Sequence, residues 1–170
     1  MEDVENSLRG GCACGAVRYA IHGAPIFVNH CHCTLCQKQT GSVGVVNAFF
    51  ERELISQTSG QTSQHIVMSG SGGEHAIIRC ADCGTALWSF YPRLGELGAG
   101  LRVGTMDNPA AFTPDAVIFT ANRMPWVALP QDIPHFEASY DAAQLLPPER
   151  FARLVALVEK RRSQKAMTHE

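Results

Sequence analysis

Residues 12–15 read Cys-Ala-Cys-Gly, and residues 80–84 read Cys-Ala-Asp-Cys-Gly. Between them, residues 31–36 read Cys-His-Cys-Thr-Leu-Cys, and these three stretches contain all seven cysteines of the 170-residue chain. Thiolates two or three residues apart can converge on one zinc ion, which takes four ligands and holds sulfur at about 2.3 Å. Seven thiolates complete one four-ligand site and leave three for a second. The spacing therefore predicts two zinc ions per chain, one of them with an open coordination position.

Disulfides and iron–sulfur clusters are the other common uses of clustered cysteines. The chain begins MEDVENSLRGG, without an apolar segment for secretion, and its odd cysteine count leaves one thiol over. Two cysteines in a CxC run are poorly placed to bridge each other. Common iron–sulfur runs are CxxCxxC or CxxxxCxxC, whereas the middle cluster here is CxCxxC. Zinc is the favoured interpretation.

The charge and hydropathy of the chain exclude several classes of protein. A formal net charge of −2 and a pI near 6.4 give no basic field for nucleic acid. No apolar run approaches the roughly 20 residues that span a bilayer. We therefore expect neither a nucleic-acid nor a membrane partner. In the absence of a targeting segment, we expect a cytoplasmic location.

Short β-rich runs dominate the first 125 residues. Val17, Tyr19 and Ile21 alternate with less apolar neighbours, as in a half-buried strand. Glycine- and proline-containing turn signals separate this run from the next ones. Further strands are predicted at residues 26–30, 43–50, 53–58, 65–69, 76–80, 86–90 and 117–122. Many short strands of this kind favour a mainly β, sandwich- or barrel-like architecture.

The C-terminal part differs in pattern. Phe151, Leu154, Val155 and Val158 share one helical face, so an amphipathic helix is predicted over residues 147–166. Two prolines suit its first turn. We expect the helix to pack on the β domain, although its apolar face would also serve as a dimer contact, and the oligomeric state stays open. Nothing in the sequence marks a second domain.

The glycines of the outer clusters indicate how a closed site is built. Gly15 and Gly84 each follow the last thiolate directly and permit a left-handed turn that points backbone N–H groups at sulfur. One zinc could then join β segments that are distant in the sequence. Spacing alone leaves other groupings open. Cys33 and Cys36 could pair with the CxxC at 80–83 as a zinc ribbon, or His30 or His32 could close the middle site.

Three thiolates with an open position have chemical consequences. Three anionic sulfurs leave a zinc centre with a net charge of −1, so its Lewis acidity toward water is lower than at a site of three neutral histidines. A soft exogenous thiol suits the fourth position better, and coordination would deprotonate it. The middle cluster therefore predicts thiol chemistry at zinc.

The chain resembles the glutathione-dependent formaldehyde-activating enzyme family, whose domain also occurs in centromere protein V. The likeness extends over residues 8–137 and includes all seven cysteines in order. It is carried by GGCACGAVRY (10–19), CHCTLCQKQTGS (31–42), RCADCGTALW (79–88) and IFTANRMPWVALP (118–130). The resemblance implies one zinc-binding domain over 8–137, with the 147–166 helix packed on it, and a mainly β, zinc-stapled fold known as β-tent or Mss4-like.

The resemblance also implies residue roles. It assigns a structural zinc to Cys12, Cys14, Cys80 and Cys83, and a catalytic zinc to Cys31, Cys33 and Cys36. Lys38 becomes a candidate to neutralise the zinc–thiolate centre or a glutathione carboxylate. The activity implied is condensation of glutathione with formaldehyde to S-(hydroxymethyl)glutathione, classed as a carbon–sulfur lyase in reverse.

Two hypotheses follow. The first is an enzyme that joins a small thiol, glutathione being favoured, to a reactive carbonyl such as formaldehyde. The second is a non-catalytic binding module in which both zinc ions are structural. A fourth protein ligand at the middle cluster would favour the module, and an open position would favour the enzyme. Phe49 and Tyr91 could line a pocket, and Trp126 could serve as a platform for substrate. All three are expected to be buried, because strands and cores usually bury aromatic side chains.

Overall fold

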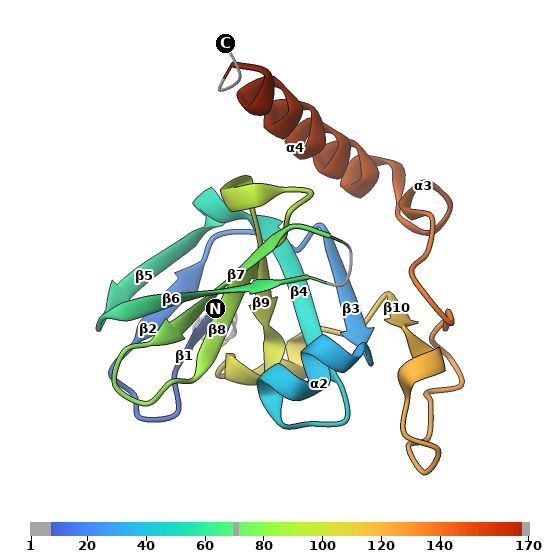
Figure 1. Cartoon of the computed structure of the whole chain (residues 1–170), viewed down its shortest axis with the longest axis horizontal. Coiled ribbons are helices and arrows are strands. Elements are labelled where there is room, and N and C mark those ends of the chain that lie inside the picture. Colours follow the sequence, from blue (N-terminus) through green and yellow to red (C-terminus); the bar gives the residue numbers. More distant parts are fainter. Residues whose placement is uncertain (1–7, 70–71, 168–170) are drawn as a thin grey trace.

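Two β-sheets dominate the computed structural model, which describes residues 8–69 and 72–167 (Figure 1). Within these residues one sheet has the strand order β1-β2-β5, and the other has the order β10-β3-β4-β9-β8-β7-β6. The strands are β1 (Arg9–Gly11), β2 (Arg18–Ile21), β3 (Phe27–Cys31), β4 (Val45–Glu51), β5 (Ile55–Ser59), β6 (Thr62–Met68), β7 (Glu74–Cys80), β8 (Ala86–Phe90), β9 (Gly98–Arg102) and β10 (Ala116–Ile118). The mainly β fold predicted from the sequence is confirmed.

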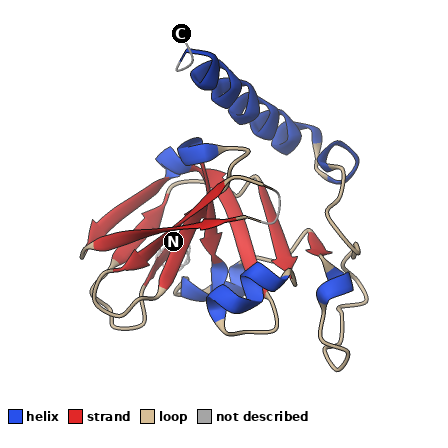
Figure 2. Cartoon of the chain, viewed as in Figure 1, coloured by secondary structure: helices blue, strands red, loops and turns tan. Residues whose placement is uncertain are grey.

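Helices are few among the described residues (Figure 2). The α-helices are α2 (Thr34–Thr40), α3 (Ala142–Leu145) and α4 (Pro148–Met167). Short 3₁₀ helices occur at Arg52–Leu54, Gly95–Leu97, Val103–Thr105, Pro109–Ala111 and Thr120–Asn122. The strands of both sheets pair antiparallel, except β10, which runs parallel to β3. This arrangement brings the C-terminal ends of β3 and β10 together, beside the start of α2.

The main core joins side chains from both sheets. Tyr19 and Ile21 of β2 pack in one buried cluster with Phe50, Trp88 and Leu101 of the larger sheet. Trp88 and Tyr19 meet edge to face, with ring centroids 6.0 Å apart. The inward residues of the two sheets therefore form a single apolar layer, as in a sandwich.

Small residues in the central strand β9 make room for two aromatic rings. A Cβ atom placed on Gly100 would lie 3.0 Å from both the Phe49 and Tyr91 rings. Those rings are 5.4 Å apart, centroid to centroid, and both stand over β9. A larger side chain at Gly100 would displace them, so the glycine fixes the position of an aromatic wall.

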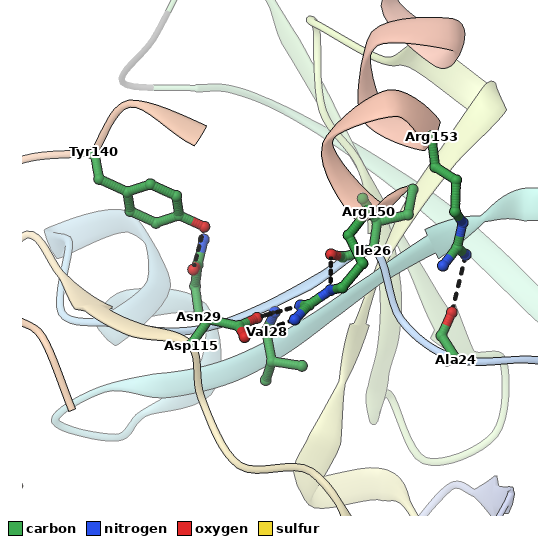
Figure 3. Close-up of polar contacts among 8 residues, drawn as sticks. All are labelled: Ala24, Ile26, Val28, Asn29, Asp115, Tyr140, Arg150 and Arg153. Carbon is green, nitrogen blue, oxygen red and sulfur yellow. Dashed lines mark hydrogen bonds and ion pairs between the residues drawn. The ribbon is translucent and has the colours of Figure 1, made fainter. Parts of the chain in front are cut away.

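The long helix α4 is joined to the start of β3 by apolar contacts and by the polar contacts drawn in Figure 3. Leu154 and Leu157 of α4 pack in a buried cluster with Ile26. Arg150 donates to the Ile26 carbonyl at 2.6 Å and forms a two-pronged ion pair with Asp115, the residue before β10. One Asp115 oxygen also accepts from the backbone N–H of Val28, at 2.7 Å. These contacts tie α4, β3 and the start of β10 into one unit.

Candidate metal centres

Four cysteines from two distant loops meet at one end of the sheets. The Sγ atoms of Cys12, Cys14, Cys80 and Cys83 all lie within 4.8 Å of one another. The first two follow β1, and the others come from the end of β7 and the turn before β8. Cys12 and Cys80 are buried, whereas Cys14 and Cys83 are exposed. This four-cysteine cluster therefore joins the smaller sheet to the larger one.

Local backbone geometry builds the four-cysteine cluster as the sequence predicted. Gly15 and Gly84 have φ values of 81° and 73°, in the left-handed region that glycine adopts readily. Each N–H bonds back to the carbonyl of the first cysteine in its loop. The N–H of Val17 points at the Cys12 sulfur, 3.2 Å away. Backbone N–H groups aimed at sulfur stabilise the thiolate form that a metal requires.

The other three cysteines lie at the junction of β3 and α2. The Sγ atoms of Cys31, Cys33 and Cys36 are within 4.8 Å of one another. Cys31 ends β3, and Cys33 caps α2, its sulfur accepting from the Cys36 N–H at 3.4 Å. Gln37 donates from its side-chain amide to the carbonyls of His32 and Asn122, at 2.6 and 2.9 Å. The three-cysteine cluster is thus held by a strand end, a short helix and the segment after β10.

Neither histidine of the middle stretch joins the three-cysteine cluster. His32 is fully buried, and its Nδ1 lies 2.9 Å from the carbonyl oxygen of Val43. The rings of His30 and His32 are in tilted contact, with centroids 4.4 Å apart. Among residues 8–69 and 72–167, no histidine, cysteine, aspartate or glutamate adds a fourth ligand atom to this cluster. The alternative grouping as a zinc ribbon, with Cys33 beside Cys80, does not occur in the described structure.

The electrostatics of the three-cysteine cluster favour negative charge on one sulfur, that of Cys33. Hydrogen bonds from the thiols of Cys31 and Cys36 lower the pKa of Cys33 to about 2. Hydrogen bonds with Cys33 and Cys36 raise the pKa of Cys31. The hydrogen bond with Cys31 lowers the pKa of Cys36, but the one with Cys33 and burial together raise it to about 11, so Cys31 and Cys36 keep their protons while Cys33 is ionised. A thiolate is the form that binds a metal ion. The all-sulfur donor sets of both clusters suit a soft ion such as zinc.

A buried arginine supplies positive charge behind this cluster. Arg102, on β9, is only 3% exposed. Its guanidinium donates to the side chains of Asn47, Gln39 and Ser89, with Gln39 and Ser89 at 3.0 and 3.1 Å. Burial alone would lower the pKa of Arg102, but its ionisable neighbours, with Tyr91 first, raise it. Arg102 therefore stays charged in a dry interior and offsets the negative cysteines.

A cavity of about 530 Å³ opens onto the three-cysteine cluster. Its wall includes all three cysteines and the rings of Phe49, Tyr91 and Phe119. No lysine, arginine, aspartate or glutamate of the described chain contributes to it. A larger cavity of about 660 Å³, between α4 and the outer strands, contains no cysteine. The 530 Å³ cavity, called the inner cavity below, is thus the one that borders candidate metal ligands.

One buried nitrogen in the wall of this inner cavity, Nε2 of His75, lacks a hydrogen-bond partner among the described residues. His75 is fully buried. Its ring stacks on Tyr91, with centroids 4.2 Å apart, and its Nδ1 lies 3.5 Å from the Gln39 amide nitrogen. Burial, together with the charge of Arg102, lowers the pKa of His75 to about 4. The imidazole is therefore neutral at physiological pH.

Sequence reasoning missed Arg102 and His75, because neither stands in a recognisable motif. Lys38, the candidate cation from the sequence, is exposed on α2 and is not part of the cavity wall. Phe49 and Tyr91 are half-buried, since one side of each ring faces the cavity. The prediction that Trp126 is buried is wrong, since it is 74% exposed. Arg123 bonds to three carbonyls of residues 124–127 and fixes that turn with the ring outside.

Comparison with known proteins bears on the same residues. Residues 7–122 match the family described as glutathione-dependent formaldehyde-activating enzyme. The chain belongs to this family. A protein of Halomonas elongata, named as a candidate glutathione-dependent formaldehyde-activating enzyme, is 29% identical over 130 residues, covering 72% of this chain and 80% of its own. Family membership inferred from the cysteine pattern is therefore confirmed.

One solved structure also aligns with this chain. A crystal structure of a Rhodobacter sphaeroides protein aligns with a TM-score of 0.45 and 19% identity, covering 58% of this chain and 87% of that one. In the part of the chain that the structure describes, no helix has the length and apolarity needed to cross a membrane.

Proposed function

We propose that this member of the glutathione-dependent formaldehyde-activating enzyme family is a zinc-dependent carbon–sulfur lyase that joins a small thiol to a reactive carbonyl compound, or releases it. Glutathione is the favoured thiol and formaldehyde the favoured carbonyl. The observation that carries the proposal is the contrast between four cysteines that complete a ligand set and three that border a cavity. The absence of a fourth protein ligand among the described residues argues against a purely structural second site.

The two clusters would hold two zinc ions in different roles. Cys12, Cys14, Cys80 and Cys83 would hold a structural ion that contributes folding free energy. Cys31, Cys33 and Cys36 would hold the catalytic ion. When bound there, zinc would supply an acceptor for an exogenous thiol in its deprotonated form.

The reaction itself is an addition that loses no atoms. The thiol sulfur attacks the carbonyl carbon, a C–S bond forms, and the π bond of the carbonyl opens. The proton that leaves the thiol ends on the former carbonyl oxygen, and the reverse reaction returns both reactants. Neutral His75 in the cavity wall is suited to hydrogen-bond that oxygen. Lys38, on the exposed side of α2, remains a proposed contact for a substrate carboxylate.

The test compares the wild-type protein with Cys33→Ser. Both are loaded with zinc, and formation of S-(hydroxymethyl)glutathione is followed by exchange NMR above the uncatalysed background. Wild type is expected to accelerate exchange, and Cys33→Ser to lose the acceleration while keeping one metal ion per chain. Equal acceleration by both proteins would refute the site, and no acceleration by wild type with any thiol would refute the proposed reaction.

A further inference from the structure

The aromatic wall of Phe49 and Tyr91 borders a second cavity besides the inner one. This second cavity, of about 220 Å³, shares Asn29, Phe49, Tyr91 and Ser139 with the inner one. Asn29 is held at this boundary by the Tyr140 hydroxyl, which donates to its side-chain oxygen at 2.9 Å (Figure 3). The outer cavity continues from these shared residues to Leu154 of α4. The two cavities therefore adjoin and extend away from the three-cysteine cluster.

Charge is distributed unevenly along these adjoining cavities. Among the described residues, Arg93 is the one side chain with a permanent charge that lines either cavity, and it belongs to the outer one. Arg93 is exposed, lies two residues after Tyr91 of the aromatic wall, and has no hydrogen bond or ion pair with described residues. No carboxylate of the described chain lines either cavity to compete for it. A cation is therefore available at the far side from the cysteines.

This arrangement restricts which thiols fit. An ionised carboxylate buried without a cation carries a large desolvation cost, so the inner cavity is unsuited to one. If the sulfur of a thiol substrate lies at the three cysteines, the segment of that substrate beside Phe49 and Tyr91 must be uncharged. An anionic group farther along the molecule would reach Arg93, whose guanidinium binds carboxylates in a two-pronged geometry.

We propose that Arg93 binds a carboxylate of the thiol substrate and so selects which thiols bind at the three-cysteine cluster. The inference rests on the proposed function, since it places the thiol sulfur at the three-cysteine cluster. Glutathione would make this contact through its glycine carboxylate. Arg93 is thus a specificity-determining residue on the opposite side of the aromatic wall from the cysteines.

The experiment measures thiol binding by titration calorimetry on the zinc-loaded full chain. The variants are Arg93→Gln, Lys38→Gln and Arg162→Gln, the last a matched arginine on the exposed side of α4 that lines neither cavity. The probes are glutathione and its diethyl ester, which keeps the sulfur and loses both carboxylates. Arg93→Gln is expected to weaken glutathione binding about tenfold, the usual effect of losing a charge-assisted hydrogen bond. It should leave ester binding unchanged, and Arg162→Gln should alter neither.

Each other outcome overturns a specific claim. If Arg93→Gln binds glutathione as wild type does, Arg93 is not the contact, while the thiol site stands. If Lys38→Gln alone shows the selective loss, Lys38 is the carboxylate contact and the Arg93 assignment is wrong. If neither glutathione nor its ester binds wild type, the proposed function itself fails, and the inference fails with it.

Discussion

The two cysteine clusters are built from the same ligand but differ in number, position and surroundings. Four sulfurs join loops of two sheets, and two of these cysteines are exposed to solvent. Three sulfurs lie at the end of β3 and the start of α2, where a cavity meets them and a buried arginine lies behind. The first arrangement could complete the ligand set of a metal ion, and it connects distant chain segments. The second leaves room for a ligand beside an incomplete set.

The comparison shows that ligand identity alone does not assign a metal site to structure or to chemistry. The four-cysteine cluster has a backbone N–H directed at the Cys12 sulfur and a glycine turn after each cysteine pair, and no cavity described above opens onto it. The three-cysteine cluster has an uncharged cavity, an aromatic wall and a neutral histidine. The number of cysteine ligands, the presence of a cavity and the charge nearby distinguish the two clusters.

The largest expected effect is the difference between the two clusters in their contribution to the free energy of unfolding. Cys80→Ser should lower the free energy of unfolding by at least about 5 kcal/mol, because a structural zinc contributes folding free energy of the same order as a whole domain's stability. Cys33→Ser should cost less than about 2 kcal/mol, since serine is itself a good cap for α2. Urea unfolding followed by circular dichroism measures both. Comparable losses of unfolding free energy in the two variants would contradict the different roles proposed for the two clusters.

Arg102 provides the next test, because it lies close to one cluster only. Arg102→Met leaves Asn47, Gln39 and Ser89 without their donor and removes the buried positive charge, a change expected to cost about 3 kcal/mol. The three-cysteine cluster should then lose its metal to a chelator sooner, while the four-cysteine cluster is unchanged. Arg102→Lys, which keeps the charge, should recover part of the metal affinity. Equal loss of metal from both clusters would contradict the proposed electrostatic role.

Substitution of His75 tests whether it contributes to the turnover rate at the three-cysteine cluster. His75→Phe keeps a ring to stack on Tyr91 but removes the ring nitrogens. Loss of one neutral hydrogen bond to the reacting oxygen should reduce turnover about fivefold, with both metal ions retained. Steady-state rates on zinc-loaded protein, with metal content as the control, give the answer. An unchanged rate would remove His75 from the reaction.

The smallest effect belongs to the four-cysteine cluster. The Thr85 hydroxyl lies 3.1 Å from the Cys83 sulfur and accepts from the Ala13 N–H at 3.2 Å, so it links the two loops. Thr85→Val should lower stability by about 1 kcal/mol through the loss of exposed hydrogen bonds. Thermal unfolding measures the change, with Thr58→Val as a control on the exposed end of β5. A loss of metal from the three-cysteine cluster in Thr85→Val would show that the clusters are coupled.

Much of the fold could be predicted because its signals are local. The strand predicted at 86–90 coincides with β8, and alternation located β2 and β3 to within about a residue. β9 was missed because its small residues, such as Gly100, show no alternation and are required by rings from other segments. The predicted strand 117–122 ends at Ile118, since Phe119 takes a left-handed φ of 56°. These features depend on tertiary packing.

The candidate site, like the fold, could be predicted from the sequence only in part. Both cysteine groups follow from spacing and resemblance, and the structure brings each together. The short helix α2 escaped prediction, although Cys33 caps it, because seven residues give little helical periodicity. Arg102 and His75 come from separate strands, and their proximity to the cysteines is a product of sheet register rather than of any motif. The predicted roles of the cysteines and of Lys38 remain predictions.

The most direct test of the central claim is the absorption spectrum of the cobalt-substituted protein before and after glutathione is added. Thiolate-to-cobalt bands report sulfur ligation, and metal analysis counts the sites. We predict two cobalt ions per chain, with glutathione changing the bands of one. Cys33→Ser should load one ion whose bands do not respond. Two closed tetrahedral sites that ignore glutathione would contradict the account and favour the binding module.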